Sequence, residues 1–396
     1  MGNKKSKPKS KQISSNKEIK NIEEPSNKTQ EKKYLDDPVL GRMVYNEIAG
    51  AWVPAQNENM YEESFKTYYK EKEENQKYLK TFYIKPQQIT NFSEDKHQTL
   101  TIIKQIPIKL EIYNHAFFLH DGRLAINWDG KLKIFNKDFE TVEQTINVQS
   151  THITQLKDNS LSNCRYKGAD IYKYDAENNK FILDYTLECK NTADKVLELS
   201  NERLALLSNS YLISIYIKEN GKYIKDGKDI CITTIDDLIQ INDNELCTIS
   251  GQESTISFWD LDKREIIAQI GDIENFGRYC LLLFDKYLIV GGASTSYIPN
   301  HFKCIYTINT ENHQLIKKYK ISYNIWFMIK INESEFFTGG SDGIIYKYKY
   351  ENNEIKLMEK NEDNKGDTVI KLAFCSNSNQ LVSMCDKRII IFKISL

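Results

Sequence analysis

An internal repeat is the feature that most constrains what this chain can fold into. A leucine or phenylalanine follows a polar turn seven times, with gaps of 37, 43, 42, 42, 48 and 45 residues. The seven positions are Leu124, Leu161, Leu204, Leu246, Leu288, Phe336 and Leu381. A period of about 40 to 45 residues is typical of four-stranded units that stack around a ring. Each of these anchor residues is therefore predicted to begin the second strand of one unit.

An apolar run ending in an aromatic residue follows each anchor, as expected for a third strand. The aromatic residues are Phe135, Tyr174, Tyr216, Trp259, Tyr306, Tyr348 and Phe392. They lie 11, 13, 12, 13, 18, 12 and 11 residues after their anchors, so the fifth unit carries an insertion. Seven such pairs in register indicate a repeat, although any one of them alone would not.

Two segments resemble the WD-repeat family. They are "TISGQESTISFWDLD" (Thr248–Asp262) and "TGGSDGIIYKYK" (Thr338–Lys349). Both have a second strand of small residues and a tight turn, and the first has a third strand ending in Trp-Asp. The resemblance implies an all-β fold over residues 99–396, a seven-bladed β-propeller of four-stranded blades. It also implies a surface that binds other proteins and no active site.

The chain departs from the family pattern in several places. Trp259-Asp260 is the only Trp-Asp pair at the expected position, and no unit has the family's Gly-His pair. The buried Asp-His-Ser-Trp hydrogen-bond network of the family is therefore predicted to be incomplete. Asp129, Asp342 and Asp386 still occupy the turn position, where aspartate accepts backbone N–H bonds. Gly291-Gly292 and Gly339-Gly340 fall in second strands, where we expect close packing.

The last unit stops at Leu396 after its third strand, so a fourth strand must come from elsewhere. The run Thr99–Ile106 is rich in β-forming residues and precedes the first unit, so we expect it to close the ring. Residues 34–98 are predicted to be a partly helical linker segment. The evidence for a helix is the spacing of apolar residues between Glu58 and Phe82.

Residues 1–33 are predicted to form a disordered basic arm, because they contain ten lysines, four glutamates and few apolar residues. The opening Met-Gly-Asn-Lys-Lys-Ser fits N-myristoylation at Gly2, and it resembles the myristoylated N-terminus of Src-type kinases. One myristoyl chain binds membrane only marginally, so a second signal is needed. That signal is predicted to come from the neighbouring lysines: Lys4, Lys5, Lys7, Lys9 and Lys11. A solvated tail without lipid is the alternative.

Other features favour a cytoplasmic protein without catalytic chemistry. No two of the eight cysteines form a CxxC pair, and the lysines at the N-terminus lack the apolar core of a secretory signal. The six histidines have neither metal-site spacing nor a nucleophile motif beside them. We therefore expect no enzyme activity, cofactor, metal or small-molecule substrate. Nucleic-acid binding is disfavoured, because the arm lacks arginines and interleaved aromatics.

The insertion of the fifth unit, residues 293–302, is the candidate partner-binding loop. It contains Tyr297, Ile298, His301 and Phe302, and aromatic residues are favoured interface anchors. The alternative is a variable loop that packs on its own blade.

Together these features predict a protein-interaction scaffold, held at the cytoplasmic face of a membrane by myristate and lysines. Its expected partners are other proteins and the anionic membrane surface. Two alternatives stay open: a soluble substrate-recognition adaptor of a larger complex such as a ubiquitin ligase, and a lipid-binding propeller. The paired-arginine motif of phosphoinositide-binding propellers is absent, and Lys387-Arg388 is a poor substitute.

Overall fold

The computed structural model describes part of the chain, and all of that part is strands and their connections. The described residues are 34–37, 41–46, 51–54, 81–82, 89–90, 100–107, 115–128, 130–148, 150, 152–231, 234–271, 273, 279–292 and 303–395. The chain divides into two compact units, Met1–Glu74 and Asn75–Leu396. The predicted basic arm and most of the predicted helix lie outside the described residues.

The first unit contains a three-stranded antiparallel sheet in the order β1-β2-β3. Its strands are β1 (Tyr34–Asp37), β2 (Gly41–Asn46) and β3 (Ala51–Pro54). The segment expected to be a partly helical linker therefore begins with strands.

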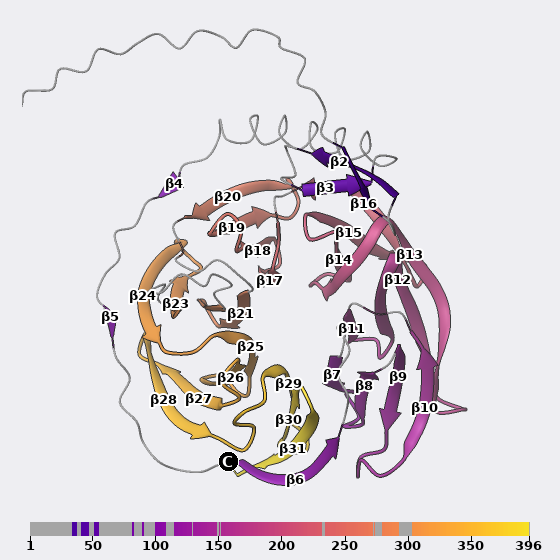
Figure 1. The fold of residues 1–396 in the computed structure, drawn as a ribbon. Coiled ribbons are helices and arrows are strands. Elements are labelled where there is room, and N and C mark those ends of the chain that lie inside the picture. Colours follow the sequence, from indigo (N-terminus) through magenta and orange to yellow (C-terminus); the bar gives the residue numbers. More distant parts are fainter. Residues whose placement is uncertain are drawn as a thin grey trace, which may run out of the picture. The chain divides into compact units, whose positions relative to one another are not determined.

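The second unit is a ring of sheets, and in most of them four strands follow one another in chain order from the centre to the outside (Figure 1). The first sheet has β7 (His115–Phe118), β8 (Leu124–Trp128), β9 (Lys131–Phe135) and β10 (Val142–Asn147). The next has β11 (His152–Gln155), β12 (Leu161–Asp175), β13 (Lys180–Glu198), β14 (Arg203–Ser208), β15 (Leu212–Glu219) and β16 (Lys222–Cys231).

Four further sheets complete the ring. The third has β17 (Asp237–Asn242), β18 (Glu245–Ser250), β19 (Thr255–Asp260) and β20 (Glu265–Ile270). The fourth has β21 (Tyr279–Phe284), β22 (Tyr287–Gly292), β23 (Lys303–Asn309) and β24 (Gln314–Ile321). The fifth has β25 (Ile325–Lys330), β26 (Glu335–Gly340), β27 (Ile345–Glu351) and β28 (Glu354–Asn361). The last has β29 (Val369–Cys375), β30 (Gln380–Cys385) and β31 (Arg388–Ile394), followed by β6 (Leu100–Pro107).

The prediction of seven separate blades was wrong in number, because the described ring has six sheets. The second and third sequence units share one six-stranded sheet. The reason is the long strand β13, which pairs with β12 up to Thr192 and then with β14 from Ala193 onward. The backbone thus passes from one unit to the next without leaving the sheet.

The repeat itself is confirmed at the level of its anchors. All seven anchors lie in the predicted second strands and are at most 1% exposed. In five units the anchor pairs directly with the predicted aromatic residue of the third strand: Leu124 with Phe135, Leu204 with Tyr216, Leu246 with Trp259, Phe336 with Tyr348, and Leu381 with Phe392. The hydrophobic clusters join neighbouring sheets, as where Phe258 of β19 packs with Leu288 of β22. The core is therefore a set of apolar layers between the sheets.

Closure of the ring by an N-terminal strand is confirmed. Strand β6 pairs antiparallel with β31, from Leu100 opposite Ile394 to Pro107 opposite Arg388. Leu100 is 2% exposed and packs in the same cluster as Phe392. The closing strand covers the outer edge of β31, an edge that would otherwise be free to pair with another chain.

Two short segments before the closing strand add to outer edges of the ring. Strand β4 (Thr81–Phe82) pairs in parallel with β20, and β5 (Ile89–Thr90) pairs in parallel with β24. The end of the predicted helix, at Thr81–Phe82, is thus a strand. Aromatic spacing in this segment fitted a helix, but the backbone pairs with a sheet that lies far away in sequence.

The incomplete WD-type network is found in altered form. Trp259 Nε1 donates to Thr248 Oγ1 at 3.0 Å, which keeps the Trp end of the network. In the fifth sheet, the hydroxyl of Tyr323 lies 2.9 Å from Thr338 Oγ1 and 2.6 Å from the hydroxyl of Tyr348. A tyrosine pair there takes the place of histidine and tryptophan.

The turn aspartates act as predicted where they are described. Asp342 accepts the N–H of Ile344 at 3.2 Å, and Asp386 accepts the N–H of Thr368 at 3.4 Å. Asp129 lies outside the described residues. All eight cysteines are free, and six of them are buried.

Candidate binding site on the inner strands

All the residues predicted to form functional sites lie outside the described residues. This holds for Gly2, for the five lysines of the arm, and for the four residues of the candidate loop. The strands that flank the loop are described, however. Gly292, the last residue of β22, pairs with Tyr279, the first residue of β21, so the loop is attached at the end of the sheet where its inner strand begins.

The innermost strands surround the centre of the ring and contact one another from sheet to sheet (Figure 1). They are β7, β11, the second half of β13, β17, β21, β25 and β29. We call the end of the ring at which these strands begin face A, and the end at which they finish face B. The candidate loop is attached at face A.

Seven inner-strand residues occupy equivalent positions near face A. Each pairs with the residue three positions after the anchor of its unit. This set, the inner layer, consists of His115, His152, Lys195, Asp237, Cys280, Phe327 and Lys371. Because the register is the same in every unit, the inner layer lies at one level of the ring.

Side chains of the inner layer contact one another across neighbouring sheets. The rings of His115 and His152 are 4.9 Å apart, edge to face. Lys195 Nζ lies 2.5 Å from Asp237 Oδ1. Lys371 Nζ lies 4.0 Å from the centre of the Phe327 ring, within the range of a cation–π interaction.

The single carboxylate among these seven residues is already bonded. Besides the ammonium of Lys195, Asp237 accepts the N–H of Leu238 at 2.9 Å and the N–H of Leu281 at 3.0 Å. Its side chain is 18% exposed, and that of Lys195 is 26% exposed. Within the described chain, no carboxylate pairs with Lys371, so the inner layer has one cation more than it has anions.

The imidazole of His115 is buried and that of His152 is half-buried, and three of their four ring nitrogens have no hydrogen-bond partner among the described residues. His115 is 9% exposed, and neither of its ring nitrogens has a hydrogen-bond partner among the residues described here; the same is true of His152 Nδ1. A buried polar group left unpaired costs about 1 to 3 kcal/mol, so such groups usually mark a site for water, an ion or a ligand.

Burial and neighbouring charge disfavour further positive charge in this cluster. Burial is the main reason that the pKa values of His115 and His152 lie well below 6.5, and the ammonium of Lys371 adds to it. Burial, followed by repulsion from Lys195, lowers the pKa of Lys371 to about 7. Near neutral pH, Lys371 is therefore poised between its charged and neutral forms.

Sequence reasoning missed the inner layer, although a positional signal exists. All seven residues lie eight to ten positions before the anchor of their unit. Six of them are polar, titratable or sulfur-containing, and Phe327 is the exception. Their side chains share no chemistry. Only the common register of the strands brings them together.

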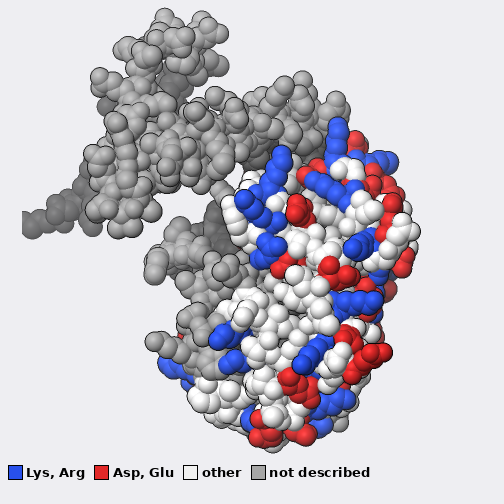
Figure 2. All heavy atoms as spheres, turned by 90° about the vertical axis from the view of Figure 1, so that its right-hand side faces the viewer, with Lys and Arg blue, Asp and Glu red and all other residues white. Residues whose placement is uncertain are grey.

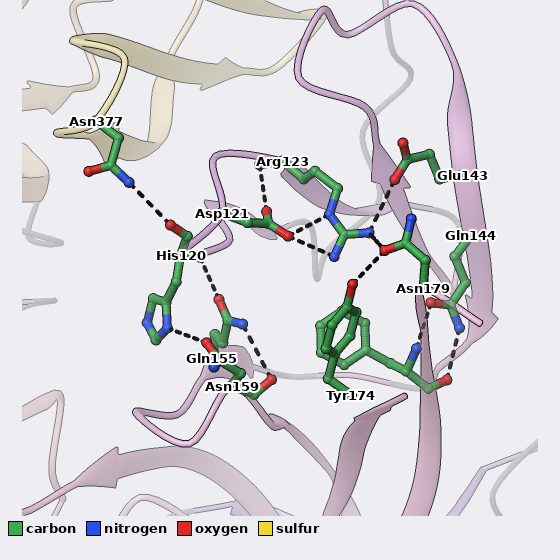
Figure 3. A network of polar contacts seen from close by, with 11 residues as sticks. His120, Asp121, Arg123, Glu143, Gln144, Gln155, Asn159, Tyr174, Asn179 and Asn377 are labelled. Atoms are coloured by element: carbon green, nitrogen blue, oxygen red, sulfur yellow. Dashed lines mark hydrogen bonds and ion pairs between the residues drawn. The ribbon is translucent and has the colours of Figure 1, made fainter. Parts of the chain in front are cut away.

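A second polar cluster lies at face B, in the turns shown in Figure 3. The guanidinium of Arg123 is 6% exposed and pairs with Asp121 at 2.8 Å and Glu143 at 3.1 Å. It also donates to Asn179 at 3.1 Å and stacks on the Tyr174 ring at 5.5 Å. Here the buried cation is paired with two carboxylates and an amide oxygen.

The same network joins three sheets. The carbonyl of His120, in the β7–β8 turn, accepts a bond from Asn377 of the β29–β30 turn at 3.2 Å. The backbone N–H of His120 donates to Gln155 Oε1 of β11 at 2.7 Å, and the Nδ1 atom of His120 lies 3.1 Å from Asn159 Oδ1. Because these groups satisfy one another, we assign the network in Figure 3 to fixing the sheets around the point of closure.

The side of the ring is mixed in charge and carries exposed apolar residues. Figure 2 shows basic and acidic side chains interspersed on the side that includes the outer strands β10, β13 and β16. These strands expose large apolar side chains: Val142 (43%), Ile182 (53%), Leu183 (53%) and Ile224 (49%). The side therefore offers apolar contact area without a strong net field.

Neither a metal site nor a membrane-spanning helix is found among the described residues. Among the residues that are placed, no group of three or more His, Cys, Asp or Glu side chains could hold a metal ion. No helix long and apolar enough to cross a membrane occurs in that part of the chain.

The chain resembles solved β-propellers in fold. No family model matches it, and no curated protein does. A chain in the crystal structure of the mitotic checkpoint complex superposes with a TM-score of 0.62 at 13% identity, covering 80% of this chain and 98% of that one. The β-propeller domain of Cps50 (Swd1) from the fungus Myceliophthora thermophila superposes with a TM-score of 0.58 at 12% identity, covering 75% of this chain and 100% of that domain. At these identities the likeness shows the fold alone.

Proposed function

We propose that this chain is a non-enzymatic, WD-repeat-type scaffold that binds other proteins through face A of its propeller. The observation that carries this proposal is the closed ring, in which β6 completes the last sheet. Closure leaves the backbone of the ring paired and presents loops and turns at two ends of a rigid body. Face A is chosen because the candidate loop and the inner layer both belong to it.

Two further observations support a binding role. The outer strands expose large apolar side chains, which mark protein contact areas when they gather on one side. One of the similar solved chains comes from a multiprotein assembly, the mitotic checkpoint complex. A propeller that gathers partners is consistent with both.

The membrane tether is the second part of the proposal, and it rests on the sequence. Myristate on Gly2 would insert in the bilayer, and the five lysines nearest to it would each add about 1 kcal/mol of attraction to anionic lipid. The protein would then work at the cytoplasmic face of a membrane. The rival proposal, a soluble substrate-recognition adaptor, needs no lipid.

The tether is tested by intact-mass analysis of the N-terminal peptide together with membrane fractionation. We expect a myristoylated Gly2 in the wild type and loss of the membrane pool in Gly2→Ala. Replacing Lys4, Lys5, Lys7, Lys9 and Lys11 by glutamine should release most of the protein while leaving the acyl chain in place. An unmodified N-terminus with a wholly soluble wild type would favour the adaptor.

A further inference from the structure

The inner layer has the composition of an anion-binding site. Lys195 and Lys371 bring two ammonium groups to it, and its one carboxylate, Asp237, is already bonded to Lys195 and to two backbone N–H groups. The ammonium of Lys371 lies over the face of the Phe327 ring, and the nearby carboxylate that favours its charge, Asp237, is shared with Lys195. A cation held in this way gains from any anion that can reach it.

Hydrogen-bond donors stand beside that cation. Strands β29, β7, β11 and β13 are consecutive inner strands, and they place Lys371, His115, His152 and Lys195 next to one another along the ring. The positive charges of Lys371 and Lys195 both lower the pKa values of His115 and His152. Three of the four imidazole nitrogens lack a hydrogen-bond partner in the described part of the chain.

We propose that Lys371, His115, His152 and Lys195 form a binding site at the centre of the ring for an oxyanion of the phosphate type. Each imidazole can donate one N–H to an oxyanion, and each ammonium can donate several. A tetrahedral oxyanion accepts bonds from several directions, which suits donors that come from four neighbouring strands. This site does not depend on the scaffold function or on the tether, and either could fail without affecting it.

Binding at this site depends on pH in a defined direction. The charged groups that face Lys371 are Lys195 and Asp237, and its neutral titratable neighbours are His115, His152 and Cys280. With the pKa of Lys371 at about 7, the ammonium is mostly charged at pH 6 and mostly neutral at pH 8. Oxyanion affinity should therefore fall about tenfold between these two values, in proportion to the charged fraction.

The test is calorimetric titration of the full-length chain with sulfate and with inorganic phosphate. Sulfate keeps its charge across this range, so its pH dependence reports on the protein alone. We expect saturable 1:1 binding of both anions, and a sulfate Kd that rises about tenfold from pH 6 to pH 8. Lys371→Met should weaken binding at least tenfold, whereas Lys371→Arg should retain it at both pH values.

Lys356→Met is the matched control, because Lys356 is an exposed lysine on the outer strand β28. It should bind sulfate like the wild type.

His152→Gln provides a second test should Lys371→Met fail to fold. In histidine-labelled protein, sulfate should shift the imidazole resonances of His115 and His152 in the NMR spectrum. Absence of saturable binding, or equal binding by wild type and Lys371→Met, would overturn the proposal.

A free oxyanion and the phosphate of a lipid headgroup share this chemistry, and a second arm separates them. The full-length Gly2→Ala chain, which cannot be myristoylated, is sedimented with vesicles that contain phosphatidylinositol phosphates. Sedimentation that depends on Lys371 would identify a headgroup as the source. Binding of soluble phosphate without sedimentation would identify a free anion as the source.

Discussion

At the scale of single residues, the anchors and the inner layer show two kinds of information. The anchors share one property, apolarity after a turn, so a sequence pattern could locate all seven. Inner-layer residues share a register and no chemistry, as His115, Asp237 and Phe327 illustrate. Their grouping is produced by the ring, which brings together residues about 40 positions apart.

Lys371 allows a residue-scale prediction about stability. Its pKa is about 7 in the folded protein, against an ordinary value of 10.5. Between these pH values the unfolded chain binds more protons, so the free energy of unfolding of the wild type should rise with pH. Lys371→Met removes this half-buried charge and should stabilise the fold by about 1 to 4 kcal/mol below pH 7.

The measurement is urea unfolding of wild type, Lys371→Met and Lys356→Met from pH 6 to pH 10. The advantage of Lys371→Met should shrink steadily as pH rises, because the wild type loses its unfavourable charge. The control Lys356→Met should follow the wild type throughout. A constant advantage across the pH range would contradict a lysine that titrates near pH 7 in the folded protein.

At the scale of elements, a strand could be predicted where a local sequence pattern marked it or where the number of strands in a unit required it. The closing strand β6 was predictable because the last unit ends one strand short. The last two residues of the predicted helix, Thr81–Phe82, form strand β4 instead, because they pair with β20, a partner that no local pattern reveals. The shared sheet of the second and third units was missed for a similar reason, because β13 continues from its pairing with β12 into its pairing with β14.

Close packing between second strands and neighbouring inner strands gives a prediction at this scale. A Cβ added at Gly339 of β26 would overlap Val369 of β29, whereas at Gly271 nothing lies within 4 Å. Gly339→Ala should destabilise the ring by about 1 to 3 kcal/mol, the usual cost of overpacking. Gly271→Ala should stay within about 0.5 kcal/mol of the wild type. Chemical denaturation measures both, and equal stability of the two variants would contradict the packing.

At the scale of the whole molecule, the ring separates two polar ends with different characters. Face B is fixed by a network in which a buried guanidinium pairs with two carboxylates, whereas face A holds imidazole nitrogens that have no hydrogen-bond partner among the described residues. Sequence reasoning predicted the propeller from its repeat. It could not tell which face is suited to binding, because that depends on hydrogen bonds between residues of different sheets.

Cross-linking mass spectrometry of the full-length chain, purified with its partners, tests the central claim most directly. Exposed lysines report on both ends: Lys131 and Lys387 belong to turns at face A, and Lys157 and Lys263 to turns at face B. A scaffold that binds proteins through face A predicts that partner peptides link mainly to Lys131 and Lys387. Links mainly to Lys157 and Lys263, or no links to any other protein, would contradict it.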